Sequence, residues 1–308
     1  MKKILFFLVI LLFVSGCANF SDVFKNLNLP GFKPPTSTGV GKSFIGGTDS
    51  ITLTILQPPE AGKVSRDVPL RVSVDVKNDG ESVAEGSVCV TGLNSNVFEE
   101  AEGCRCEEFS LKGKSRFEDE TVEGEHETFN FDEGPATIDE FTINSFSVTS
   151  IARYGYKTYA SVEGCIAKDI LTSKECKPRQ DAKLLGVSSA PLQITAVSQE
   201  LLLIADEEYS MTLFIEVTHK GKGQFFSSSA EKDVCGEEDD NLNKMVAVRL
   251  YNSPGRASCS PLVFKSKEDK GTATCTIEGI DARDYKPLIN VELSYVYEIR
   301  DSNSFEVV

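Results

Sequence analysis

Hydrophobic and polar residues alternate with a period of two through most of the chain after residue 50. Residues 70–77 place four aliphatic side chains on one face and polar ones on the other, and the turn sequence Asn78-Asp79-Gly80 follows. Residues 288–300 alternate over a longer run, with Val296 as the one departure. Such alternation is typical of half-buried β-strands, whereas an amphipathic helix repeats every 3.6 residues. The pattern therefore predicts an all-β fold.

Each half of the chain contains several such segments, separated by turn sequences. In the first half we expect strands at 51–56, 70–77, 85–93, 137–148 and 158–167. In the second half we expect them at 191–199, 209–223 (ending in a glycine turn), 245–251, 261–266, 271–279, 288–300 and 305–308. Many short strands with turns and no long helical pattern favour β-sandwiches. We predict a sandwich over 49–190, with an irregular acidic insertion at 94–136, and a second sandwich over 191–308.

Two similar motifs precede the penultimate strand predicted for each half. Ala152-Arg153 is followed by Tyr156-Lys157, and Ala282-Arg283 is followed by Tyr285-Lys286. In immunoglobulin (Ig)-type sandwiches a tyrosine near this turn bonds the backbone upstream through its hydroxyl, which is called the tyrosine corner. We therefore predict structural roles for Tyr156 and Tyr285, and two tandem Ig-like sandwiches.

The strand–turn–strand sequences resemble the Ig-like modules of prokaryotic surface proteins, especially the CARDB type. The resemblance lies in VPLRVSVDVKNDGESVAEGSVCV and, more faintly, in YSMTLFIEVTHKGKG. It covers under a sixth of the chain, and the chain departs from the type in its cysteine-bearing acidic insertion and its lack of tryptophan. The resemblance implies a fold and a surface setting, and it implies no particular ligand.

The first seventeen residues have a different pattern. Lys2 and Lys3 precede an unbroken apolar run from Ile4 to Val14, which is too short for a lasting membrane span and typical of a signal peptide. The run ends in Ser15-Gly16-Cys17, and the whole resembles the lipobox of prokaryotic lipoproteins, including archaeal ones. We expect a signal peptide at 1–16 and a lipidated Cys17 that begins a flexible linker ending at residue 48. The alternatives are an ordinary secretory signal and a short membrane anchor that happens to carry a cysteine.

Charge and the scarcity of histidine narrow the functional classes. The formal net charge of −15 argues against nucleic-acid binding, which needs clustered lysine and arginine. The two histidines, His126 and His219, have no partner at zinc-binding spacing and are expected in solvated loops. The acidic clusters at 118–127, 206–208 and 237–240 lack the regular spacing of a calcium loop, so we expect solvated loops there too. We expect no catalytic residue, cofactor or metal site.

Eight cysteines remain after Cys17, which outside the cytoplasm suggests a disulfide framework. They are Cys89, Cys104, Cys106, Cys165, Cys176, Cys235, Cys259 and Cys275. The first half holds five and the second half three, so four bridges require an odd number of links between the halves. We expect Cys259 to pair with Cys275 and Cys165 with Cys176. Cys89 then takes Cys104 or Cys106, and the other one of these two pairs with Cys235. The alternative is a free thiol in each half.

These expectations combine into one functional hypothesis and one competitor. The hypothesis is a lipid-anchored protein on the outer face of the cell membrane, whose tandem Ig-like domains have a non-catalytic binding, adhesion or envelope-assembly role. Its partners would be the membrane, through the lipid, and another envelope or surface protein or polymer. The competitor is an extracytoplasmic enzyme or solute-binding subunit with a site in the acidic loops. A concave pocket with converging polar groups would favour the competitor.

Overall fold

The computed structural model describes residues 44–93, 97–98, 103–117, 120–136, 145–205, 208–230, 232, 234–235, 245–264 and 269–308. The described residues form nineteen strands, and no helix occurs among them. Residues 41–308 group into one compact unit. The all-β fold that the alternation predicted is confirmed. The predicted signal peptide, Cys17 and almost all of the predicted linker lie outside the described residues.

The largest sheet has nine strands, which come from both predicted halves of the chain. Its main path runs in the order β17 (Leu262–Val263), β15 (Met245–Tyr251), β19 (Leu288–Val307), β9 (Ser145–Glu163), β4 (Ala84–Thr91) and β5 (Cys104–Leu111). Three further strands join it at the side: β11 (Lys183–Val187) pairs with β9, while β14 (Gln224–Phe226) and β2 (Gly62–Val64) pair with β19.

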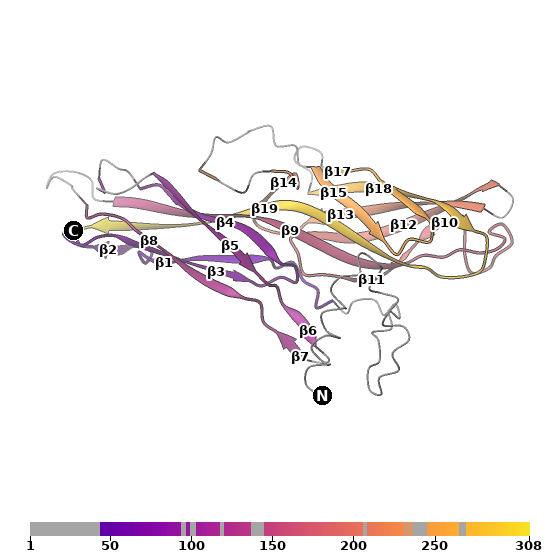
Figure 1. Ribbon diagram of the computed structural model, residues 1–308, viewed down its shortest axis with the longest axis horizontal. Coiled ribbons are helices and arrows are strands. Elements are labelled where there is room, and N and C mark those ends of the chain that lie inside the picture. The colour runs from indigo at the N-terminus through magenta and orange to yellow at the C-terminus, as the bar shows by residue number, and fades with distance from the viewer. Residues whose placement is uncertain are drawn as a thin grey trace, which may run out of the picture. The chain divides into compact units, whose positions relative to one another are not determined.

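The axis of this sheet is the antiparallel pair β9 and β19, which lie side by side in Figure 1. The pairing runs without interruption from Ser145 opposite Glu306 to Glu163 opposite Leu288. Since β9 precedes and β19 follows the boundary predicted between residues 190 and 191, the two predicted sandwiches share one sheet. The boundary itself stays a prediction.

Two smaller sheets pack on the nine-stranded sheet, over opposite ends of the β9–β19 pair (Figure 1). One has the order β1 (Ile51–Gln57), β3 (Arg71–Asn78) and β8 (His126–Asp132). The other has the order β10 (Arg179–Asp181), β12 (Leu192–Ala205), β13 (Glu208–His219), β18 (Lys270–Asp281) and β16 (Arg256–Cys259). The aliphatic faces predicted for 70–76 and 211–217 are buried between the layers.

The expectation of irregular structure over 94–136 is wrong for most of its described residues. This stretch supplies β5 to the large sheet, β8 to the three-stranded sheet, and a separate hairpin of β6 (Ser115–Phe117) and β7 (Glu120–Val122). β5 buries Phe109 and Leu111, and β8 buries Phe129 and Phe131. Each strand contributes only two alternating apolar residues among charged ones, so the period of two was hidden by the acidic outer face.

Four tyrosines form the centre of the core, where the two halves meet. Tyr154 and Tyr156 on β9 lie directly opposite Tyr297 and Tyr295 on β19. All four side chains are at most 2% exposed, and neighbouring rings contact one another in edge or tilted geometry. Each hydroxyl has a hydrogen-bonding partner, as buried phenol groups require.

Candidate functional site

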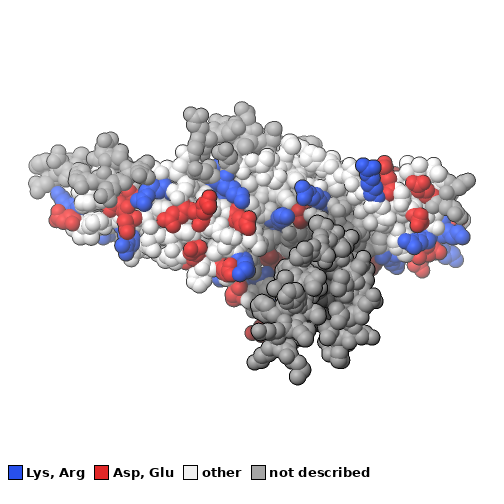
Figure 2. Space-filling view, viewed as in Figure 1, with Lys and Arg blue, Asp and Glu red and all other residues white. Residues whose placement is uncertain are grey.

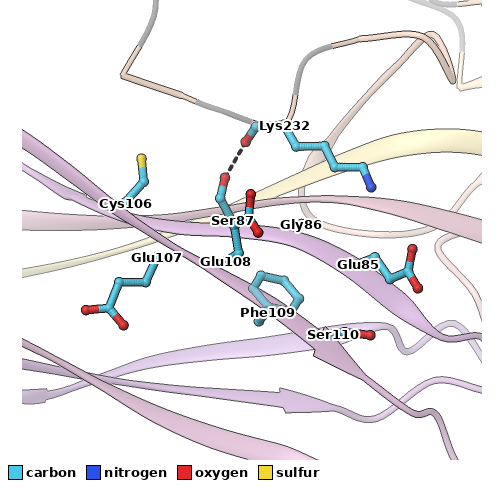
Figure 3. A pocket seen from close by; sticks show the side chains of 9 residues that line it. All are labelled: Glu85, Gly86, Ser87, Cys106, Glu107, Glu108, Phe109, Ser110 and Lys232. Atoms are coloured by element: carbon cyan, nitrogen blue, oxygen red, sulfur yellow. Dashed lines mark hydrogen bonds between the residues drawn. The ribbon is translucent and has the colours of Figure 1, made fainter.

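A hollow of about 520 Å³ lies over β4 and β5, on the face opposite the three-stranded sheet (Figure 3). Its lining consists of Glu85, Gly86, Ser87, Cys106, Glu107, Glu108, Phe109, Ser110 and Lys232. The strands supply all of these residues except Lys232, which belongs to the second half of the chain. The hollow is therefore a place where the two halves meet outside the shared core.

Lys232 is attached to the sheet by both its backbone and its side chain. The hydroxyl of Ser87 donates a hydrogen bond to the carbonyl oxygen of Lys232, drawn as the dashed line in Figure 3. The aliphatic part of the lysine runs over Gly155 of β9, where an added Cβ atom would lie 3.4 Å from the lysine Cε. An added Cβ atom at this position would therefore be in ordinary van der Waals contact with the lysine side chain.

Four disulfides tie the fold together. Cys89 on β4 pairs with Cys106 on β5, and Cys104 pairs with Cys235. Cys165 pairs with Cys176, and Cys259 pairs with Cys275. Of the two alternatives that the sequence left open for Cys89, the structure takes Cys106. The bridge from Cys104 to Cys235 links the two predicted halves and fixes the segment around Lys232 to the edge strand.

The sulfurs of two of these bridges crowd together beside the hollow. The Sγ atoms of Cys106 and Cys235, which belong to different disulfides, are 3.1 Å apart. Together with the Sγ of Cys89 they all lie within 4.8 Å of one another. Metals bind the thiolate form of cysteine, so in the disulfide form this group is not a thiolate metal site. The sequence indicated a bridge between the halves but not this contact between two bridges.

The carboxylates at the hollow do not converge. Glu107 and Glu108 are neighbours on β5, so their side chains leave opposite faces of the strand. Glu85 and Glu107 point away from each other in Figure 3, and all three side chains are exposed. Neither Glu107–Glu108 nor Glu85–Glu107 therefore forms the kind of carboxylate pair that general acid–base chemistry uses.

The structure places the two histidines differently. His126 is exposed at the start of β8. His219 is half-buried, and its Nε2 is 3.0 Å from the hydroxyl of Tyr297, while its ring packs edge-on against Phe225. The expectation of a solvated loop is wrong for His219, because the turn after β13 folds back onto β19.

The acidic clusters are only partly described. In the first cluster, Glu123 lies 3.8 Å from the ammonium of Lys77, and Glu125 binds both the backbone N–H and the ammonium of Lys112. These bonds lower the pKa of Glu125. Both carboxylates therefore have basic partners within the fold. Residues 118–119, 206–207 and 237–240 lie outside the described residues.

The tyrosine-corner assignment needs a correction. Tyr156 fits it: its hydroxyl accepts a bond from the Ser82 N–H at 3.3 Å and donates to the Ser189 carbonyl at 3.4 Å. Tyr285 does not, because its side chain is half-buried beside the guanidinium of Arg283. The matching position in the second half belongs to Tyr297.

The hydroxyl of Tyr297 is hydrogen-bonded to the backbone of the turn after β13, as the hydroxyl of Tyr156 is to the backbone of the turn after β3. The Tyr297 hydroxyl accepts a bond from the Gly223 N–H at 2.9 Å, and burial raises its pKa to about 12. A Cβ added at Gly80 or Gly221 would strike the hydroxyl of the respective tyrosine, so both turns need glycine. In the sequence, the feature that marks these two tyrosine contacts is the glycine in the turn after β3 and after β13, Gly80 and Gly221, rather than the Ala-Arg motif.

Comparison with known proteins concerns the N-terminus. The family model for the prokaryotic membrane lipoprotein lipid attachment site matches residues 1–18, which include Cys17. No curated protein matches the chain. No helix in the described part of the chain is long and apolar enough to cross a membrane. The chain thus carries a prokaryotic lipid attachment site, and the protein is lipid-anchored on the extracytoplasmic face of the membrane.

Proposed function

We propose that this lipid-anchored protein has a non-catalytic binding role in envelope assembly or adhesion, and that it binds an extended segment of another envelope protein along β12. The observation that carries the proposal is the run Leu202-Leu203-Ile204, whose side chains are 67%, 54% and 56% exposed. Three consecutive exposed aliphatic residues cover both faces of a strand, and exposed apolar patches mark interaction sites.

The backbone of β12 is open at the same place. β10 pairs with β12 only from Ser198 to Glu200, and the Leu201 N–H then bonds the carbonyl of Pro178. From Leu202 to Ala205, β12 pairs with β13 on its inner side, and no described strand pairs with its outer edge. An open edge can accept an added strand through main-chain hydrogen bonds.

The surroundings indicate the chemistry of that segment. Leu171, which is 82% exposed, lies in the loop whose residues Asp169 and Thr172 line a pocket with Leu203. Glu200, Glu208 and Asp281 are exposed at the margins of this area. A partner strand that alternates apolar and basic residues would match both features.

The Ig-like, CARDB-type relationship and the tandem arrangement of two sandwiches belong to the same proposal. Two buried tyrosines bonded to two equivalent glycine turns support the repeat.

A peptide-binding experiment tests the proposal. The probe is a ten-residue peptide of alternating valine and lysine, and the control peptide alternates valine and glutamate. We expect only the basic peptide to bind, with slower hydrogen exchange at the amides of 202–205. The double variant Leu203→Ser/Ile204→Ser should bind much more weakly, and Leu185→Ser, which alters an exposed leucine on β11, should bind normally.

Two results would contradict the proposal. One is equal binding of both peptides; the other is binding without protection of the 202–205 amides. The competing class, an enzyme or solute-binding subunit, is supported instead if a small extracellular solute raises the melting temperature while the double serine variant behaves like the natural protein.

A further inference from the structure

The disulfides Cys89–Cys106 and Cys104–Cys235 lie in contact through one sulfur atom of each. This contact is close enough for thiol–disulfide exchange between the two bridges. The contact joins Cys106 and Cys235 at 3.1 Å, one sulfur from each bridge. Exposure differs sharply along the group: Cys235 is exposed, Cys104 and Cys106 are half-buried, and Cys89 is fully buried. Thiol–disulfide exchange needs an attacking thiolate close to a disulfide sulfur, and the geometry supplies that closeness internally.

We propose that these two bridges form a capture site for a small aliphatic thiol, at which Cys104 takes up the thiol and the cross-link to Cys235 moves onto Cys106. In the first step the incoming thiolate attacks the Sγ of Cys104. A mixed disulfide forms, the bond between Cys104 and Cys235 breaks, and its electron pair leaves on Cys235 as a thiolate. The hollow of about 520 Å³, which Cys106 lines, lies beside the two bridges and has room for a small thiol.

In the second step the Cys235 thiolate attacks the Sγ of Cys106. The bond between Cys106 and Cys89 breaks, its electron pair stays on Cys89, and Cys89 takes a proton from water. One disulfide between protein and thiol and one internal disulfide replace two internal disulfides, so no oxidant or reductant is consumed. The incoming thiol loses the proton that Cys89 gains.

Cys89 is the buried end of this group of sulfurs. It is 0% exposed, and because burial disfavours its thiolate, Cys89 is released slowly in the second step and, once protonated, also attacks slowly in the reverse step. Its sulfur lies 3.9 Å from the hydroxyl of Ser87. The same hydroxyl donates a hydrogen bond to the carbonyl oxygen of Lys232. This bond keeps the segment that carries Cys235 next to β4 during the exchange of disulfide partners.

The protein contains a matched control bridge. Cys259 and Cys275 lie opposite each other on β16 and β18, as Cys89 and Cys106 do on β4 and β5, with a Cα–Cα distance of 4.0 Å in both pairs. In both bridges one sulfur belongs to a fully buried cysteine and the other to a half-buried one. No second bridge adjoins Cys259–Cys275 among the described residues.

The test treats the natural protein with glutathione, stops the reaction with iodoacetamide in urea so that buried thiols are also alkylated, and maps the peptides without reduction. We expect glutathione on Cys104, alkylation of Cys89, and a peptide cross-link between Cys106 and Cys235. Because the second step is intramolecular, alkylation of Cys89 should be at least about tenfold faster than alkylation of Cys275.

A double variant separates the transfer from simple reduction. In Cys104→Ser/Cys235→Ser, alkylation of Cys89 should slow to the rate of Cys275, with circular dichroism as the check on folding. The proposal is overturned if glutathione appears on Cys235 with Cys89–Cys106 intact, or if Cys89 and Cys275 are alkylated at the same rate. Both outcomes are read from the natural protein, so they hold even if the variant fails to fold.

Discussion

Arg153 on β9 and Glu298 on β19 lie directly opposite each other and form a buried ion pair between the two halves of the chain. The Nη2 and Nε atoms of the arginine are 2.6 and 2.8 Å from one carboxylate oxygen, and the side chains are only 9% and 2% exposed. Arg300 binds the other oxygen at 2.8 Å, and the ring of Phe226 covers the guanidinium of Arg153. In the large sheet, therefore, the two halves are held together by buried charge as well as by apolar packing.

Removing this carboxylate charge should destabilise the fold strongly. Glu298→Gln leaves the guanidinium of Arg153 buried without its counter-ion, a defect that costs about 3–5 kcal/mol. Urea denaturation at neutral pH measures the free energy of unfolding. Glu306→Gln on the same strand is the control, because that carboxylate is 59% exposed and its partner Lys63 is 69% exposed. Equal shifts in the two variants would contradict the role given to the buried pair.

The two predicted corner tyrosines should respond differently to loss of their hydroxyl groups. Tyr156→Phe leaves the buried N–H of Ser82 and the carbonyl of Ser189 without this partner, which costs about 1–2 kcal/mol. Tyr285→Phe should leave the urea midpoint nearly unchanged, since this side chain is half-buried beside Arg283. A larger loss at Tyr285 than at Tyr156 would restore the assignment made from the sequence.

Acid should weaken the turn that Tyr156 closes. Burial raises the pKa of Asp79, but hydrogen bonds from Lys77, Thr52 and Lys114 outweigh it and hold the pKa below its ordinary value of 3.8. A carboxyl group with a lowered native pKa contributes stability above the ordinary value and loses it as the pH falls through the native pKa.

The variant Asp79→Asn tests this dependence. At pH 7 it should unfold at lower urea concentration than the natural protein, because it lacks the ionised partner of two lysines. The difference should shrink as the pH falls through the lowered native pKa of Asp79, since the carboxyl group is then protonated in both the folded and the unfolded states. Urea midpoints measured across this range check the sign, and a difference that is constant with pH would exclude Asp79 as the cause.

Lipid attachment should depend on Cys17. The attachment-site match at 1–18 predicts that Cys17→Ser abolishes the mass increment of the acyl chains and releases the protein from the membrane fraction. Intact-mass measurement of the mature N-terminus is the direct check. A natural protein whose mature N-terminus lies elsewhere and carries no lipid would contradict the assignment.

Several features followed from the sequence because they depend on local pattern. The alternation at 70–76 and 289–297 predicted strands whose inward residues are buried, since a strand can direct only every second side chain into a core. The parity of the cysteines predicted a bridge between the halves, because an odd number in each half leaves one unpaired. The lipid attachment site was visible because signal processing reads the chain before it folds.

Other features were decided only by the tertiary structure. The register of β4 against β5 places Cys89 opposite Cys106 rather than Cys104, and strand register is set by contacts distant in sequence. Val296 breaks the alternation because its face of β19 is also covered, with Lys232 lying over its neighbour Gly155. The sulfur contact and the exposed edge of β12 arise where separate segments come together or end, so no single stretch of sequence encodes either of them.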